Sequence, residues 1–140
     1  MSALSDLASY LADRIPEVEG RVYPLLAQQG EPTPYLVYQQ DSETPGYELS
    51  GEAGYAELMA TYAVWSRDMG ECERLMDATR LALTGVTDLT IGDTQIDVVL
   101  VESGETDAVQ VLDGEATGLL SKSQQFFIRY FRTVATAPGV

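Results

Sequence analysis

Histidine is absent from this chain of 140 residues, and cysteine occurs once, as Cys72. Without histidine the chain cannot form a Ser–His–Asp triad, a Cys–His pair or a zinc site with histidine ligands. A single cysteine cannot form an internal disulfide or a thiolate cluster. Cys72 lies on the apolar stripe of a predicted helix, where we expect a small buried side chain.

Basic residues are few and scattered. Lysine and arginine number 8 against 22 aspartates and glutamates, which gives a formal net charge of −14. Affinity for nucleic acid depends mainly on lysine and arginine side chains that neutralise phosphates. The basic residues here occur singly between Arg14 and Arg132, so the sequence argues against specific DNA or RNA binding. The simplest interpretation of the acidity is solubility.

Other catalytic patterns are also missing. A phosphate-binding loop needs a glycine ahead of its lysine, but Ala116 occupies that position before Lys122. Acidic residues such as Asp93 and Asp97 border predicted turns, where carboxylates are common, and no basic groups accompany them for a phosphodiester substrate. We therefore predict a protein that is not an enzyme and has no catalytic residues, cofactor or metal.

No apolar run approaches the roughly 20 residues that span a bilayer. The first residues carry neither a basic region nor a signal-like apolar stretch, so we expect a soluble protein kept in the cytoplasm. The hydrophobic fraction of 45% can supply a core without staples. We expect a single domain over residues 1–140.

The periodicities predict an α+β fold. Apolar residues at helical spacing predict helices over 3–15 and 69–84; Asp68 and Glu71 resemble a capping box, and Gly85 is expected as a left-handed cap. Strands are predicted at 22–27, 35–41, 55–66, 94–101, 106–112 and 121–133. Together these predict a mixed, largely antiparallel sheet of four or more strands flanked by two main helices, an α/β sandwich.

Two predicted strands are apolar on both faces. Over 35–41 the alternation places Tyr35 and Val37 opposite Leu36 and Tyr38. This pattern is typical of a strand covered on its second face by a helix or by a neighbouring subunit. The last strand alternates in the same way, so we interpret it chiefly as core, with an inter-subunit contact as the alternative.

Residues 42–54 form an acidic segment without clear periodicity, which we interpret as a long connection. Long connections in compact domains are usually functional or disordered. Two interpretations stay open: a wide hairpin tip, or an arm that reaches a neighbour or the lumen of a ring.

A series of short motifs resembles one known family. In order they are Arg21-Val-Tyr-Pro24, Ala27-Gln-Gln-Gly30, Pro34-Tyr-Leu-Val-Tyr-Gln39, Leu49-Ser-Gly51 and the strand over 60–66. The set, which spans residues 3–85, resembles the tail-terminator, or tail-completion, proteins of long-tailed phages and phage-like gene-transfer particles. The resemblance fades in the last third of the chain.

The resemblance implies a structural virion protein at the junction of head and tail, assembled in the host cytoplasm. Such a protein forms a ring, usually a hexamer, that caps the tail tube, ends its polymerisation and joins the tail to the head connector. Its partners would be further copies of itself, the tail-tube protein and the head-connector or stopper protein. DNA would pass through the ring without specific binding, and no membrane is involved.

Two sets of residues in or next to the 42–54 segment are candidate site residues because of their place in the chain. Tyr47, Leu49 and Tyr55 are candidates for inter-subunit or tail contacts, because apolar and aromatic anchors dominate interfaces. Glu43, Glu48 and Glu52 are candidates for an acidic lumen that DNA crosses without adsorbing. The alternative function is a small acidic binding module, such as a DNA-mimic inhibitor or an assembly chaperone.

Overall fold

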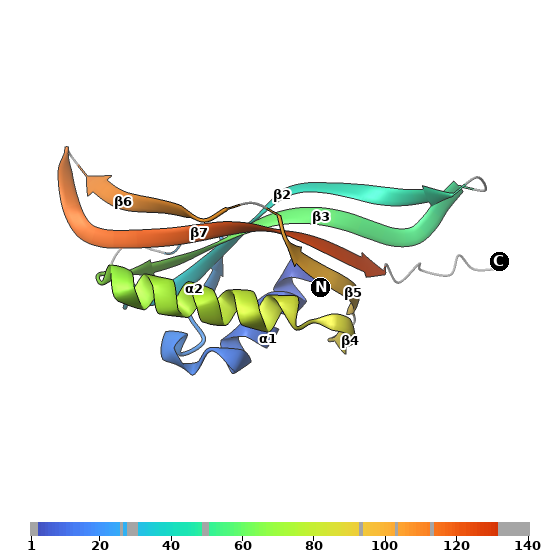
Figure 1. Ribbon diagram of the computed structural model, residues 1–140, viewed down its shortest axis with the longest axis horizontal. Helices are drawn as coiled ribbons and strands as arrows, with labels where there is room; N and C mark the ends of the chain where they lie inside the picture. The colour runs from blue at the N-terminus through green and yellow to red at the C-terminus, as the bar shows by residue number, and fades with distance from the viewer. Residues whose placement is uncertain are drawn as a thin grey trace.

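The computed structural model describes residues 3–25, 27, 31–48, 51–92, 94–102, 104–112 and 114–131. Figure 1 shows a long sheet with two helices beneath it. The elements are α1 (Ala3–Arg14), the 3-10 turn η1 (Pro16–Val18), β1 (Val22–Pro24), β2 (Tyr35–Glu48), β3 (Gly51–Ser66), α2 (Met69–Thr84), β4 (Thr87–Ile91), β5 (Thr94–Val101), β6 (Thr106–Leu112) and β7 (Glu115–Phe131). The predicted α+β class is confirmed.

The seven strands of the described residues form one sheet in the order β1-β2-β3-β7-β5-β4. β6 pairs with the first half of β7, and β5 pairs with its second half. β1 runs parallel to β2, while every other pairing is antiparallel. The prediction of a mixed, largely antiparallel sheet is confirmed.

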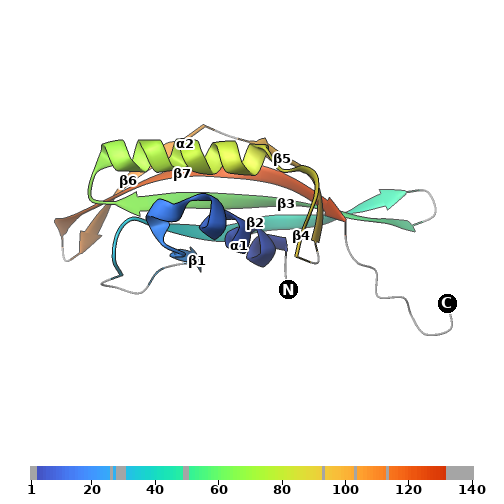
Figure 2. The same cartoon turned by 90° about the horizontal axis from the view of Figure 1, so that it is seen from below.

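Both helices cover the same face of the sheet, as Figure 2 shows from the helix side. Leu7 and Leu11 of α1 and Leu75 and Met76 of α2 are fully buried there. They enclose Tyr62 of β3, and each such aliphatic side chain contributes about 1.5–3 kcal/mol on burial. Neither helix is long and apolar enough to cross a membrane in the part of the chain described.

A buried carboxylate ties α1 to the turn before β5. Asp6 is almost fully buried and accepts a hydrogen bond of 2.5 Å from the Thr94 hydroxyl. Gly92 lies beside it with φ +59°, and a Cβ at Gly92 would come within 2.7 Å of the Asp6 carboxylate. Glycine at this turn therefore meets two requirements, a left-handed backbone and a close approach.

The ends of α2 differ in part from the prediction. The Asp68 carboxylate caps the helix by accepting from the Gly70 amide, as expected, but Glu71 accepts from the Ser66 hydroxyl instead of closing the capping box. The Asp68 amide donates to that same hydroxyl. Gly85 was expected to be left-handed, which is wrong: its φ is −77°, because its amide donates to the Leu81 carbonyl in a right-handed last turn.

Three strand predictions also need correction. β1 has three residues because its pairing with β2 stops at Pro24, so the strand predicted over 22–27 was too long. β4 was not predicted, because its exposed face gives no apolar alternation. β7 starts at Glu115, six residues earlier than predicted, where it pairs with β6; Arg132 and Thr133 of the predicted strand lie outside the described residues.

The largest correction concerns residues 42–54, which are not a loose connection. β2 and β3 continue through them as a hairpin whose pairing reaches Glu48 and Gly51. This hairpin projects past the helices in Figure 1, so neither of its faces needs a regular apolar side. Pro45 fits within it because β2 is unpaired on its outer side there, among the described residues.

Candidate interaction surface

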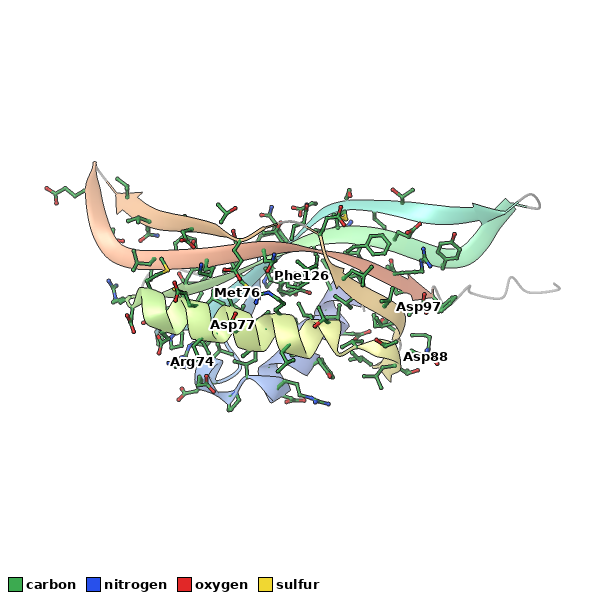
Figure 3. The ribbon with its side chains drawn as sticks, viewed as in Figure 1. Arg74, Met76, Asp77, Asp88, Asp97 and Phe126 are labelled. Atoms are coloured by element: carbon green, nitrogen blue, oxygen red, sulfur yellow. The ribbon has the colours of Figure 1, made fainter. Side chains whose placement is uncertain are left out.

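One face of the sheet is covered by helices and the other has no helix over it in the described chain. Figure 3 shows Met76 of α2 and Phe126 of β7 meeting on the covered side, where both are fully buried. Residues that alternate with the core point to the opposite side, which we call the open face. Its central members are Val37 and Gln39 of β2, Met59 and Thr61 of β3, Gln125, Phe127 and Arg129 of β7, and Leu100 of β5.

An apolar row crosses the open face. Leu100, Phe127 and Met59 lie directly opposite one another on three adjacent strands. Tyr55 and Phe131 form a second such pair on the same face, and the Glu57–Arg129 pair lies between it and the row. Leu100 is 51% exposed and Phe131 43%. Neighbouring apolar side chains that stay exposed in so acidic a chain are typical of a surface that another protein covers.

A hollow of about 260 Å³ lies beside this row, at the root of the β2–β3 hairpin. It is lined by Ser42, Thr44, Glu57, Leu58, Met59 and Phe127. The lining is mostly apolar with one carboxylate at its edge, which fits the side chain of a partner protein better than a polar small molecule.

Arg129 is held in place at the centre of the open face. Its guanidinium lies 3.3 Å from the Glu57 carboxylate and 3.7 Å from that of Asp97. The same group lies 5.3 Å from the ring centre of Tyr55 and 6.0 Å from that of Phe127. The Arg129 guanidinium therefore already contacts two carboxylates and two aromatic rings. These contacts make it less available to bind the phosphates of a nucleic acid.

Asp41 binds three polar side chains of the open face, those of Gln39, Thr61 and Gln125, next to the apolar row. Its carboxylate accepts hydrogen bonds from Thr61 at 2.6 Å and from Gln125 and Gln39 at 2.9 Å each. Partial burial raises the pKa of Asp41, but these three donors to the charged form outweigh it, so the pKa lies below its usual value. A bulge between Gln40 and Ser42 places Asp41 there.

Two hairpins extend the sheet at opposite ends of the molecule (Figure 1). The β2–β3 arm, residues 42–57, projects at one end, and the β6–β7 arm, residues 106–118, projects at the other. The β2–β3 arm reaches well past the helices, whereas only the tip of the β6–β7 arm does so, and both β2 and β6 have an unpaired outer edge among the described residues.

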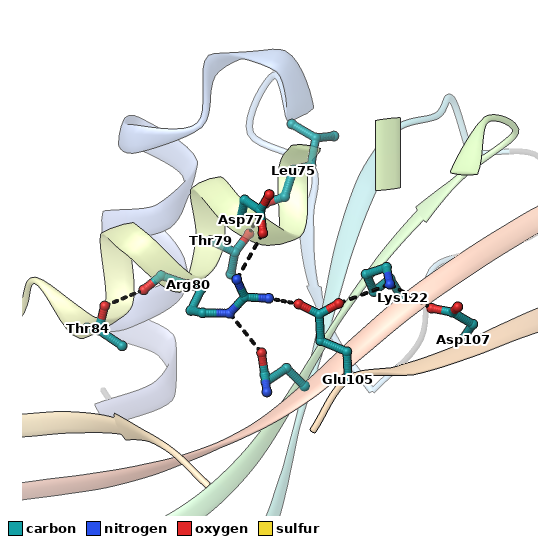
Figure 4. A network of polar contacts seen from close by, with 9 residues as sticks. Leu75, Asp77, Thr79, Arg80, Thr84, Glu105, Asp107 and Lys122 are labelled. Atoms are coloured by element: carbon teal, nitrogen blue, oxygen red, sulfur yellow. Dashed lines mark hydrogen bonds and ion pairs between the residues drawn. The ribbon is translucent and has the colours of Figure 1, made fainter. Parts of the chain in front are cut away.

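A charged network joins the β6–β7 arm to α2, as Figure 4 shows. Lys122 of β7 contacts Glu105 at 2.9 Å and Asp107 at 3.0 Å. Arg80 of α2 forms an ion pair with Glu105 and donates to Gln124 at 2.9 Å. These contacts fix the direction in which the arm leaves the body.

The predicted contact residues lie on or near the β2–β3 arm. Tyr47 lies in β2 at the tip, opposite Glu52, and Leu49 lies outside the described residues. Tyr55 lies farther from the tip, opposite Phe131 and against Arg129. Tyr55 is therefore the one of the three whose described side chain joins the apolar part of the open face.

The predicted acidic set is spread along the same hairpin. Glu48 and Glu52 lie in the paired tip strands. Glu43 pairs with the buried Leu58, and its carboxylate accepts a hydrogen bond from the Tyr130 hydroxyl. Glu43 therefore lies on the helix side of the sheet and not with Asp41 on the open face.

The prediction of contact residues missed Met59, Leu100 and Phe127. The double-sided apolar pattern of 121–133 contained the signal for Phe127, since it indicates a second covered face. Met59 and Leu100 lie in alternating strands whose open side cannot be told from the covered side by sequence. Among the described residues, no group of three or more Cys, Asp or Glu side chains is arranged to hold a metal ion.

Comparison with known proteins gives a fold likeness only. No family model matches the sequence, and no curated protein matches it. Among solved structures, the chain is similar to one from the "Virion of native gene transfer agent (GTA) particle", with a TM-score of 0.66 and 12% identity over 93% of this chain and 98% of that one. A second solved chain, 14% identical over 89% of this chain and 88% of its own, reaches a TM-score of only 0.39. This protein thus has the fold of a chain from a phage-like particle.

Proposed function

We propose that this protein is a structural, non-catalytic component of a phage-like virion that forms a ring, caps the tail tube and joins it to the head connector. The fold likeness to a chain of a gene-transfer-agent virion, over nearly the full length of both chains, carries the proposal. The tail-terminator motifs between residues 3 and 85 support the finer role. The position would be the head–tail junction of the particle.

The surface supports a role in assembly. The apolar row of Leu100, Phe127 and Met59 and the adjacent hollow offer a site for a protein partner. The two arms at opposite ends allow one copy to touch neighbours on both sides. Partners would be further copies, as a hexamer by the family resemblance alone, with the tail-tube protein on one side and the connector on the other.

The charge distribution supports passage of DNA. Arg129 is paired with two carboxylates, so it offers little positive charge to a phosphate, and the Asp41 carboxylate on the same face adds a negative charge. An acidic lumen lined by Glu43, Glu48 and Glu52 is part of this proposal. Repulsion from such a lining acts only over about 8 Å at physiological salt, so only carboxylates at the channel wall matter.

Deletion of the gene from a particle-producing strain tests the function. The account predicts tail tubes of uncontrolled length that do not attach to filled heads, with both defects reversed by a plasmid copy. Electron microscopy of the particles reads out both properties. Tails of normal length joined to heads in the deletion strain would refute the proposal.

The alternative, a small acidic module that mimics DNA or acts as an assembly chaperone, makes a different prediction. A DNA mimic presents regularly spaced free carboxylates, but in α2 Glu71 accepts from Ser66 and Asp77 pairs with Arg80. A mimic or chaperone would also be missing from finished particles. Detection of the protein in purified particles by mass spectrometry separates the two functions.

A further inference from the structure

Several strands have one side unpaired among the described residues, including β1 and β4 at the two ends of the strand order, and two such edges, on β2 and β6, belong to the projecting arms. β1 covers β2 only at Leu36–Tyr38, and the Leu25 amide adds a last bond to the Tyr38 carbonyl. Beyond that point, no strand of the described chain lies on the outer side of β2. β6 likewise pairs with β7 alone among the described strands.

The edge of β6 lacks the usual protection against pairing. Proteins guard exposed edges with charges or proline, but residues 108–112 of β6 contain neither. The one charged residue of the strand, Asp107, pairs with Lys122 of the same sheet. Val109 is 51% exposed and Val111 56%. On the β2 side, residues 39–44 contain no proline, and their two charged residues bond within the sheet: Asp41 accepts from Thr61, and Glu43 accepts from Tyr130.

The strand directions favour joining these two edges. Across the sheet, β2, β3, β7 and β6 alternate in direction, because each is antiparallel to the next. Four strands are an even number. A second copy placed beside the first by rotation about a ring axis, to which the strands are inclined, therefore brings its β2 antiparallel to β6 of the first copy. Because each copy contributes an even number of strands, neighbouring strands stay antiparallel all the way round a ring of any number of copies.

The two edges are also offset along the strands. β6 lies beside residues 115–123 of β7, whereas the open part of β2, through β3, lies level with residues from Gln125 onward. Closing a sheet into a ring requires such a stagger, since the strands must tilt relative to the ring axis. The offset between the β6 edge and the open β2 edge provides this stagger.

We propose that β6 of one copy pairs antiparallel with residues 39–44 of β2 in the next copy, so that the ring closes through one continuous sheet. This inference rests on the proposed ring-forming function. The contact is head-to-tail, since one edge meets a different edge, and such contacts close into rings. The partner at both edges is a second copy of this chain.

Engineered disulfides test the pairing directly. Val109 pairs with Leu120 and lies on the helix side of the sheet, as do Gln40 and Glu43, which pair with the buried Ala60 and Leu58. Ser42 pairs with Met59 and lies on the open side. The variants are Val109→Cys combined in turn with Gln40→Cys, Glu43→Cys or, as the matched control, Ser42→Cys. The native Cys72 is buried and does not compete.

The expected result after oxidation is a covalent species of ring size from Val109→Cys with Gln40→Cys or Glu43→Cys, and little from the Ser42→Cys control. Each single variant should stay monomeric on a non-reducing gel, and a mixture of two complementary single variants should give dimers and nothing larger. A dimer from Val109→Cys alone would mean that β6 pairs with β6, which overturns the proposal.

A charge variant checks the same edge without cross-linking. Val109→Lys with Val111→Lys should reduce the assembled mass to that of the monomer, 15.2 kDa, with an unchanged circular dichroism spectrum. Leu81→Lys, at an exposed position of α2, should leave assembly intact. Rings that persist in the edge variant would contradict the strand pairing, and so would rings that form without any helix-side cross-link. Neither result would contradict the ring-forming function. A wild-type protein that never assembles overturns both.

Discussion

Lys122 of β7 and Asp107 of β6 lie directly opposite each other, with 3.0 Å between the Lys122 Nζ and the Asp107 Oδ1. The Lys122 side chain is only 11% exposed and also contacts Glu105, which Arg80 links to α2. This lysine therefore sits where the β6–β7 arm, the sheet and a helix meet.

The first prediction concerns this lysine. Lys122→Ala should destabilise the fold by about 2 kcal/mol, less than the 3–5 kcal/mol typical of breaking a fully buried pair, because the Asp107 side chain is 58% exposed. Urea unfolding measures the loss. A double-mutant cycle with Asp107→Ala should give a coupling of about 1 kcal/mol. Additive effects of the two substitutions would show that the pair contributes nothing to stability.

The second prediction concerns pH and Asp41. Its folded-state pKa is depressed, so the carboxylate stabilises the fold above the unfolded value near 3.8 and loses this contribution as the pH falls through the folded value. Carbon-detected NMR should place the Asp41 midpoint below 3.8. Thr61→Val removes the shortest of the three hydrogen bonds and should raise that midpoint. An unchanged midpoint in Thr61→Val would contradict the assigned cause.

The third prediction concerns the β2–β3 arm. Residues 45–56 can be replaced by an Asn-Gly turn that joins Thr44 to Glu57, which already face each other. The monomer should keep its fold, because Ala56 is the one buried residue among the described side chains of 45–56 and it lies outside the core cluster, while tail completion should fail. Thermal unfolding and particle counts measure the two effects. Normal particles from the shortened protein would exclude the arm from assembly.

The fourth prediction concerns the lumen. Glu48→Lys with Glu52→Lys should slow DNA ejection, most strongly at low salt, because lysine forms salt-dependent contacts with phosphate. Glu43 is omitted because its carboxylate bonds Tyr130. Asp13→Lys with Glu73→Lys, at exposed positions on the helices, makes the same change in net charge and is the control. Equal ejection rates for both variants would assign the acidity of the arm to solubility alone.

The sequence predicts the helices and strands that have strong apolar periodicity. It does not predict the elements whose conformation depends on contacts with distant parts of the chain. Both helices were placed to within one residue, because Pro16 and the Asp68 cap mark a boundary locally. The sequence predicts a connection at 42–54 because this segment shows no alternation of apolar and polar residues, although its backbone pairs as a hairpin. β4 was not predicted for a similar reason: four of its five residues are exposed, so its sequence shows no apolar alternation.

The candidate surface was predicted less well than the fold. The double-sided apolar pattern of β2 and β7 predicts a second covered face, but it does not show which residues share a row across strands. Leu100, Phe127 and Met59 come together only through the register of three strands. Register is a long-range property, so a search within one segment cannot find this row.

The mass of the purified protein tests the central claim most directly. Light scattering after size exclusion, with and without the tail-tube protein, measures it, and negative-stain microscopy shows whether the assembly has a central hole. The account predicts a closed ring; six copies of 15.2 kDa give 6 × 15.2, or about 91 kDa. A particle that stays at 15.2 kDa at every concentration, alone and with the tube protein, would contradict it.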